Sequence, residues 1–297
     1  MAKLEINSKT QGAELTSIKL DGIEKLHQGE NILDENGKAF WNRHAPILFP
    51  IVGQIKNGTT IIDGKEYKMS QHGFARDMEF EEIKKDSNIH KYVLKSNEKT
   101  LEKFPYKFEL YITYTIENNS LEIKYTVINK DNKEMQFGLG GHPAFICDYS
   151  SGDYELEFNK NEDNFELLKL DNGLIGKEHF ENIIKENKIK LHKDIFNEDA
   201  IIMKNLKSNE ITLKDTRNNK IVLKFDFTGF PYLAIWSKKG APFVCIEPWF
   251  NTADNIDSDG IFEHKENILK INPNDKFECK YKVEFYNKEE LKWVKKN

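Results

Sequence analysis

The chain has few cysteines and no long apolar run, and each shortage excludes a class of protein. Only 3 of its 297 residues are cysteine. This is an odd number without metal-ligand spacing, so we expect neither a disulfide framework nor a cysteine-based metal centre. No run approaches the roughly 18 apolar residues of a membrane-spanning helix, and residues 1–17 lack the apolar core of a signal peptide. We therefore expect a cytoplasmic protein without a membrane partner.

An excess of basic over acidic charge is also lacking, so we expect no nucleic-acid partner. The formal net charge is −5, so no basic face is expected. With 38% hydrophobic and 31% charged residues, the composition is that of a globular protein. Among 44 lysines and arginines, only Arg43, Arg76 and Arg217 are arginine. A planar guanidinium can grip hydroxyl or phosphate oxygens, and Arg43 and Arg76 lie near the motifs described below.

Short segments in which apolar and polar residues alternate occur along the whole chain. Residues 108–116 and 121–128 alternate in this way around the turn residues 117–120, which predicts a β-hairpin. Asp63 and Gly64 form the dipeptide that favours a tight hairpin turn. Similar patterns predict strands within residues 60–67, 211–213, 221–225 and 279–285.

Helical signals are few. Lys177–Asn187 and Asn287–Lys296 are the two segments for which we predict short helices. Repeats and glycine- or serine-rich linkers are absent, and the polar stretch 159–164 is too short to separate domains. We predict an all-β fold, a large antiparallel β-sandwich with few short helices, formed by one domain over residues 1–297.

Three motifs place proton-carrying side chains among glycine, proline and aromatic residues. His72, His142 and Glu247 lie in the strings SQHGFAR, FGLGGHPAF and VCIEPW. Two glycines precede His142 and allow a close approach of backbone or ligand, while the following Pro143 favours an extended backbone. Glu247 is expected to end a buried strand, where an unpaired carboxylate is costly. A histidine and a carboxylate are the acid and base that opening of a sugar ring requires.

Other side chains near these motifs could bind a sugar. Arg76 could donate charge-assisted hydrogen bonds to it, or pair with a neighbouring carboxylate. Arg43 could reach the same pocket or remain on the surface, and Asp199 could accept a sugar hydroxyl or cap the strand that follows it. Trp249 and Phe145 could stack on the apolar face of a sugar ring, or could belong to the core, as aromatic residues more often do.

In this order and spacing, the three motifs resemble those of the aldose 1-epimerase (galactose mutarotase) family. The likeness is greatest to bacterial epimerase-like proteins associated with lactose-utilisation operons. It also includes residues 12–18, 46–53 and 196–202, and it extends over residues 4–285. The resemblance implies a galactose mutarotase-like supersandwich and an isomerase activity on a monosaccharide. Because mutarotation also proceeds slowly in water without a catalyst, we expect no cofactor.

The resemblance also implies a role for each motif. His142 matches the catalytic acid of the family, Glu247 the catalytic base and His72 a second active-site histidine. Glu247 would remove the C1 hydroxyl proton of a cyclic aldose while His142 protonates the ring oxygen, and ring closure after rotation about C1–C2 would give the other anomer. The carboxylate is expected to raise the pKa of the histidine and keep it charged.

Arg43 and Asp199 correspond to substrate contacts of the family, and Arg76 to an arginine of a branch that acts on hexose phosphates. That branch has an Arg-Gly-Gly string before its proline-containing marker, whereas this chain has Arg-His-Ala from Arg43. The substrate is therefore expected to be an aldohexose, with or without a phosphate group. We expect the protein to be a monomer or a homodimer.

Several alternatives to an aldose 1-epimerase remain open. The protein could be a hexose-6-phosphate 1-epimerase, or a carbohydrate-binding protein without catalysis, because a fold does not determine function. A glycosidase could use Glu247 with Asp199, although both active-site histidines would then have no role. His72, His142 and Glu247 lack the spacing of a metal site, and we expect no bound metal.

Overall fold

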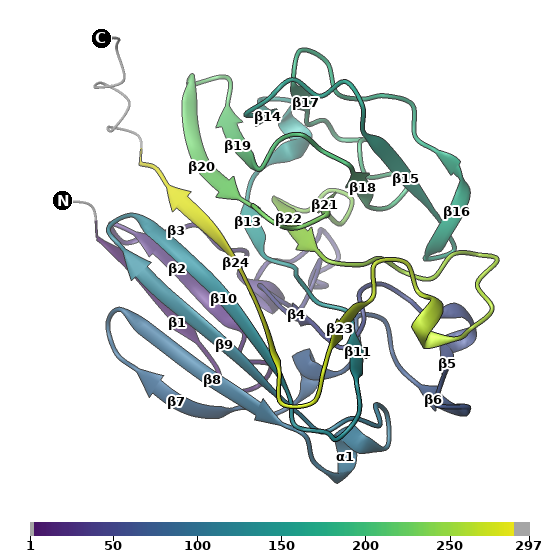
Figure 1. The fold of residues 1–297 in the computed structure, drawn as a ribbon. Coiled ribbons are helices and arrows are strands. Elements are labelled where there is room, and N and C mark those ends of the chain that lie inside the picture. Colours follow the sequence, from purple (N-terminus) through teal and green to yellow (C-terminus); the bar gives the residue numbers. More distant parts are fainter. Residues whose placement is uncertain (1–2, 288–297) are drawn as a thin grey trace.

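The computed structural model describes residues 3–287, and most of its elements are strands (Figure 1). Nine of them form one antiparallel sheet, in which β24 from the end of the chain lies between β20 and β10. Across this sheet the order is β17 (Lys188–Lys190), β14 (Tyr154–Phe158), β19 (Glu210–Asp215), β20 (Lys220–Asp226), β24 (Lys276–Phe285), β10 (Ser120–Asn129), β9 (Phe108–Glu117), β8 (Ile89–Lys95) and β7 (Glu81–Lys85).

A second antiparallel sheet has eight strands, and β22 near its middle has two short partners, β12 and β13, along the same edge. Its order is β16 (Leu174–His179), β15 (Glu166–Asp171), β18 (Ile201–Lys204), β21 (Tyr232–Trp236), β22 (Phe243–Trp249), β12 (Gly140–Gly141) and β4 (Ile47–Leu48), with β13 (Ala144–Ile146) beside β22.

Smaller elements surround these sheets. A three-stranded sheet contains β1 (Leu4–Ser8), β2 (Leu15–Leu20) and β3 (Ile23–Glu24). Two-stranded pairs are β5 (Thr59–Ile62) with β6 (Lys65–Lys68), and β11 (Met135–Phe137) with β23 (Leu269–Ile271). Helical segments are α1 (Glu98–Leu101) and the 3₁₀ turns η1 (Gly29–Asn31), η2 (Lys56–Gly58), η3 (Ala75–Asp77), η4 (Tyr149–Ser151) and η5 (Phe262–His264).

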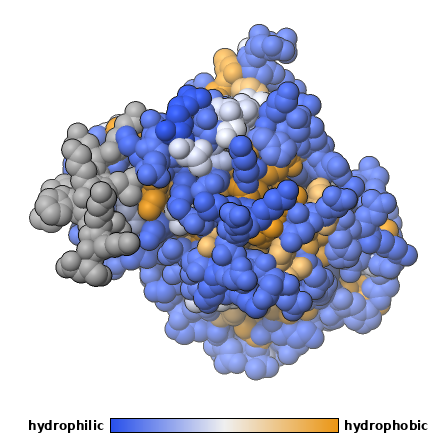
Figure 2. All heavy atoms as spheres, turned by 90° about the horizontal axis from the view of Figure 1, so that it is seen from above, coloured by the Kyte–Doolittle hydropathy of each residue, from blue (hydrophilic) through white to orange (hydrophobic). Residues whose placement is uncertain are grey.

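The main core lies between the two large sheets. Phe145 on β13 contacts Phe225 on β20 and Phe285 on β24, with ring centroids 6.1 Å apart in each pair. In the nine-stranded sheet, β9 and β10 alternate buried and less buried residues, because successive side chains of a strand point to opposite faces. In the eight-stranded sheet, β22 is buried on both faces. On the face shown in Figure 2, hydrophilic residues cover most of the surface, and hydrophobic residues are visible between them.

The predicted all-β, antiparallel architecture is confirmed. Residues 108–116 and 121–128 lie in the hairpin β9–β10, and Asp63 and Gly64 connect β5 to β6 with φ values of 49° and 73°. Both turn residues thus have the positive φ that a two-residue type I′ turn requires.

The predicted helix over Lys177–Asn187 is wrong. Its first residues belong to β16, which pairs with β15 through a turn at Asn172 and Gly173. The Asn-Gly dipeptide is a strong hairpin signal that the sequence analysis did not use. Most of the second predicted helix, Asn287–Lys296, lies outside the described residues. Within residues 3–287, no helix is long and apolar enough to cross a membrane.

Candidate active site

The site lies on the face of the eight-stranded sheet that points away from the main core. Along β22, Val244 and Ile246 join the main core, whereas Cys245, Glu247 and Trp249 point to the other face. The sequence analysis expected Glu247 at the end of a buried strand. It lies instead inside the fully buried strand β22. A side chain in the interior of a paired strand has little freedom to move, so the carboxylate is fixed in place.

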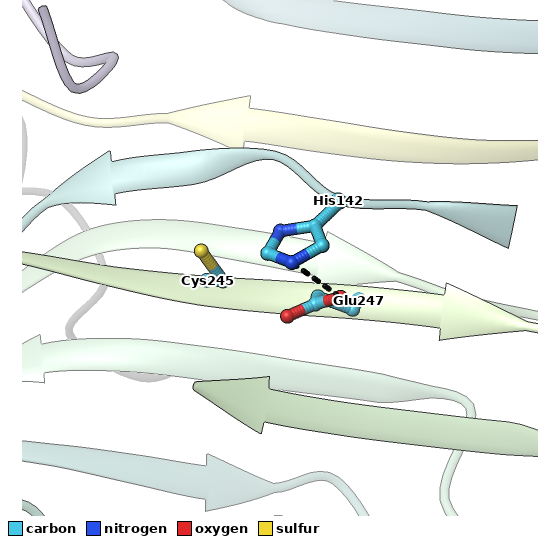
Figure 3. Close-up of side chains that lie close together, drawn as sticks. All are labelled: His142, Cys245 and Glu247. Carbon is cyan, nitrogen blue, oxygen red and sulfur yellow. Dashed lines mark ion pairs between the residues drawn. The ribbon is translucent and has the colours of Figure 1, made fainter. Parts of the chain in front are cut away.

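The strand register brings His142 opposite Glu247. Gly140 on β12 pairs with Trp249, and Ala144 on β13 pairs with Cys245, so the residue midway between them faces Glu247. The His142 Nε2 and Glu247 Oε2 atoms are 3.3 Å apart. Figure 3 shows the imidazole directed at the carboxylate, with Cys245 on the same side of β22.

The two glycines before His142 are needed for close packing. A Cβ atom at Gly140 would lie 2.7 Å from Cδ1 of Trp249. At Gly141 it would lie 3.0 Å from the hydroxyls of Tyr125 and Tyr281. A larger residue would push this segment away from β22 and would move the imidazole with it.

Aromatic rings surround the imidazole of His142. Trp41 stacks on it with ring centroids 4.9 Å apart, and Trp236 meets it edge-on at 5.7 Å. His72 also meets it edge-on, at 5.5 Å. These contacts restrict rotation of the ring and separate it from bulk water, so its orientation is set before a ligand binds.

His72 is positioned by its backbone and by one hydrogen bond. Its φ is 65°, an uncommon value for a residue with a side chain. The backbone N–H of Gly53 donates to its Nδ1 at 3.1 Å, which leaves the proton of the neutral ring on Nε2. Burial lowers the pKa of His72 well below its ordinary value, and the neighbouring His142 and the positive charge of Arg76 act in the same direction. His72 is therefore a neutral ring that can donate from Nε2.

These side chains open onto a cavity of about 550 Å³, within the range of small-molecule sites. Five of the six predicted site residues line it, namely His72, Arg76, His142, Asp199 and Glu247. Polar and aromatic side chains that the sequence analysis did not identify also line it, among them Phe40, Trp41, Gln54, Gln71, Asn172, Trp236 and Lys238. A wall that mixes hydrogen-bonding groups with aromatic faces suits a sugar, which has hydroxyl edges and apolar faces.

Arg43 does not line this cavity. Its Nη2 donates to Asp77 Oδ1 at 2.8 Å, and it lies in a neighbouring depression. Arg76 borders both spaces, with Nη2 donating to the carbonyl of Gln71 at 2.6 Å and Nε without a hydrogen-bond partner. Burial, together with the nearby charge of Arg43, lowers the pKa of Arg76 to about 10, so the guanidinium stays charged at neutral pH.

The two aromatic residues named in the sequence analysis have different surroundings. Trp249 lines the cavity, and its buried Nε1 has no hydrogen-bond partner. The expectation that Phe145 stacks on a sugar is wrong, because its ring is buried in the main core. Asp199 lines the cavity with a φ of 76°, and its Oδ1 accepts the Ala200 N–H at 2.8 Å.

Burial sets the protonation of the central pair. It lowers the pKa of His142 to about 3, with the positive charges of Arg76 and Arg43 acting the same way. It raises the pKa of Glu247 well above its ordinary value. This corrects the expectation that the carboxylate raises the histidine pKa. A neutral histidine beside a protonated glutamate carries one proton, as does an imidazolium beside a carboxylate. Both shifts favour the neutral form of the pair, and in either form the pair holds a single proton, which can lie on either side.

Comparison with known proteins agrees with this geometry. The sequence model of the aldose 1-epimerase family matches residues 2–260. The chain belongs to the aldose 1-epimerase family. It is 32% identical to the plasmid and chromosomal LacX proteins of Lactococcus lactis subsp. lactis, covering 96% of this chain and 97% of each relative.

Solved structures show the same relationship. A galactose mutarotase-related enzyme from Lactobacillus acidophilus superposes with a TM-score of 0.85 at 30% identity, covering 97% of this chain and 98% of the other. A galactose mutarotase-like protein from Lactobacillus casei has the same TM-score and identity, covering 96% and 99%. This family member therefore has the galactose mutarotase-like supersandwich fold that its sequence implied.

Proposed function

We propose that the protein is an aldose 1-epimerase that interconverts the α and β anomers of a hexose or related sugar by acid–base ring opening. The observation that carries this proposal is the distance of 3.3 Å between His142 Nε2 and Glu247 Oε2 on the wall of one cavity. Family membership supports a sugar as the substrate. The sequence features described above support a cytoplasmic, single-domain protein that needs no cofactor.

The single proton of the pair suits this reaction. With the proton on His142, the Glu247 carboxylate removes the C1 hydroxyl proton while the imidazolium protonates the ring oxygen, and the C1–O5 bond breaks. The pair then consists of a protonated Glu247 and a neutral His142, the state that burial favours. After rotation about C1–C2, the reverse transfers close the ring as either anomer. No proton needs to enter from solvent at any step.

Other residues of the wall would hold the sugar. His72 can donate from Nε2, and Asp199 and Gln54 offer oxygens that accept from hydroxyls. The face of Trp249 can pack against the C–H side of the ring. These contacts would fix C1 and O5 between His142 and Glu247, and such positioning contributes to rate beyond the proton transfers themselves.

The decisive experiment measures α–β exchange by NMR for a panel of free and phosphorylated aldohexoses. We expect catalytic amounts of protein to accelerate exchange of at least one sugar above its spontaneous rate. Saturable sugar binding without faster exchange would instead indicate a carbohydrate-binding protein. Release of a reducing sugar from an oligosaccharide would indicate a glycosidase that uses Glu247 and Asp199.

A hexose-phosphate 1-epimerase is the second candidate, and Arg76 favours it. This guanidinium lies between the cavity and the neighbouring depression, where Lys9, Lys38 and Arg43 also lie. A phosphate on the bound sugar could meet Arg76 there. Within the same panel, a preference for phosphorylated hexoses that is lost in Arg76→Gln would support this candidate.

A further inference from the structure

One side chain beside the catalytic pair has no part in the proposed reaction. Cys245 lies two residues before Glu247, on the same face of β22, and its sulfur lies on the side where the imidazole of His142 is found (Figure 3). The thiol is fully buried and free of any disulfide. One ligand atom from each of His142, Cys245 and Glu247 lies within 4.8 Å of the other two. Imidazole, thiol and carboxylate are the three ligand types that zinc binds in proteins.

We propose that His142, Cys245 and Glu247 form a binding site for Zn²⁺ or a similar thiolate-binding divalent ion, and that the ion inhibits the enzyme. The binding half of this proposal rests on geometry alone. The inhibition half rests on the proposed function. The two halves are therefore tested separately below.

The catalytic pair already has the spacing of two zinc ligands. In a tetrahedral site with Zn–N near 2.0–2.1 Å and Zn–O near 2.0–2.2 Å, the nitrogen and oxygen are about 3.4 Å apart. The corresponding atoms of His142 and Glu247 are 3.3 Å apart. A Zn–S bond of about 2.3 Å places sulfur about 3.6 Å from the nitrogen. The ligand atoms of the three residues lie within 4.8 Å of one another, so the sulfur of Cys245 has to approach the nitrogen by up to about 1.2 Å.

Charge balance also suits a buried site. A dication bound by a thiolate, a carboxylate and a neutral imidazole forms a site whose charges cancel, so no net charge is buried when the metal binds.

The site has ligand capacity to spare and a path to solvent. Glu247 is only 1% exposed, and its buried Oε2 has no hydrogen-bond partner besides the facing Nε2 of His142, 3.3 Å away. Glu247 and His142 both line the cavity, so an ion can enter from it and keep a fourth position open toward it. Such an ion would occupy the His142 nitrogen and the Glu247 oxygen that exchange protons with the sugar. Mg²⁺ should not bind, because it prefers oxygen ligands.

Binding is tested with Co²⁺ on tag-free protein, because a thiolate bound to cobalt gives a near-ultraviolet charge-transfer band. We expect the band in wild type and in Cys279→Ala, the matched control. We expect its loss in Cys245→Ala, in His142→Asn, and on displacement by excess Zn²⁺. A wild-type protein without the band, or a band that persists in Cys245→Ala, would overturn the proposal. If Cys245→Ala does not fold, His142→Asn decides the same question.

Inhibition is tested by α–β exchange in the presence of Zn²⁺. Wild type should slow in proportion to occupancy of the site, and Mg²⁺ should have no effect. Cys245→Ala should keep its basal exchange rate and require at least about tenfold more Zn²⁺ for half-inhibition, since it lacks one of three ligands. Equal sensitivity of the two proteins contradicts the proposal. If no sugar is exchanged at all, the proposed function fails, whereas the cobalt band still decides whether the metal binds.

Discussion

At the scale of single residues, the site depends on two ionisable groups that would each be unfavourable alone. His142 is 7% exposed and Glu247 1% exposed. Their mutual contact and their shared proton make the burial tolerable, because no net charge is isolated from water. Burial makes the pair energetically costly, and it also holds the two groups in one geometry. The geometry that the chemistry needs and its cost in stability therefore have the same origin.

The first prediction concerns removal of either partner. Glu247→Gln and His142→Asn should each lower the anomerisation rate by roughly 10²–10⁴-fold, the typical contribution of general acid–base catalysis. Folding should be preserved, since amides of similar shape replace both groups, and polarimetry with circular dichroism measures both effects.

The matched controls for these variants are Glu178→Gln and His264→Asn, whose side chains are 83% and 60% exposed. They should retain wild-type rates. Near-wild-type anomerisation by Glu247→Gln or His142→Asn would remove that residue from the mechanism.

The second prediction is a pH profile with a low acid limb. The pair works while it holds one proton. It gains a second one only below the pKa of His142, about 3, and loses the last one above the raised pKa of Glu247. Enzymatic kcat/KM, corrected for spontaneous exchange, should therefore stay constant as pH falls through the ordinary imidazole value of 6.5. An acid limb centred near 6.5, with the fold intact by circular dichroism, would disprove this assignment of protons.

At the scale of elements, the site exists because two short strands share one neighbour. β12 and β13 both pair with β22, and the gap between them holds His142 opposite Glu247. The glycines of β12 let this segment lie close to Trp249 on one side and to Tyr281 on the other. Register and small side chains thus set the distance between His142 and Glu247.

The third prediction follows from this packing. Gly140→Ala would place its Cβ 2.7 Å from the Trp249 ring, and such overpacking typically costs about 1–3 kcal/mol. The displaced strand should also misplace His142, and a shift on the order of 1 Å can lower activity about 100-fold. Thermal denaturation and NMR exchange measure the two effects.

Gly176→Ala in β16 is the control for this variant. Its Cβ would meet only Asp171 and Lys169, at 3.3 Å and beyond, so activity should be unaffected. Wild-type exchange by Gly140→Ala would show that the approach of β12 to β22 does not position the histidine.

At the scale of the whole molecule, the cavity joins segments that are distant in sequence. Its wall includes Trp41, His72, His142, Asp199 and Glu247, which belong to different loops and strands. A ligand bound there contacts many parts of the chain at once, and it has no equivalent site in the unfolded protein. Binding should therefore stabilise the fold as a unit.

The fourth prediction is that a sugar substrate raises the Tm. At a sugar concentration of about 100 times Kd, the stabilisation should be about 2.7 kcal/mol. Trp41→Ala should show a smaller shift, because the ring that stacks on His142 and lines the cavity is lost. Calorimetry with and without sugar tests this, and an unchanged Tm at saturation by a sugar that is turned over would contradict it.

Local patterns in the sequence determined the β-sheet character, several hairpins and the motifs around His72, His142 and Glu247. Alternation of side chains and turn chemistry act over a few residues, so they can be read without knowing the fold. The predicted helix over Lys177–Asn187 failed because pairing of β16 with β15 outweighs a weak local preference.

Only the tertiary structure decided which distant residues meet and what their surroundings do to them. Contacts between remote segments place Trp41 and Trp236 against the ring of His142. Such contacts also pair Arg43 with Asp77 and bury Phe145. Burial lowers the pKa of His142, and no local sequence pattern reports burial. This shift is opposite to the one expected from a neighbouring carboxylate. Proton affinities in a buried site depend on the whole enclosure, and folding alone creates that enclosure.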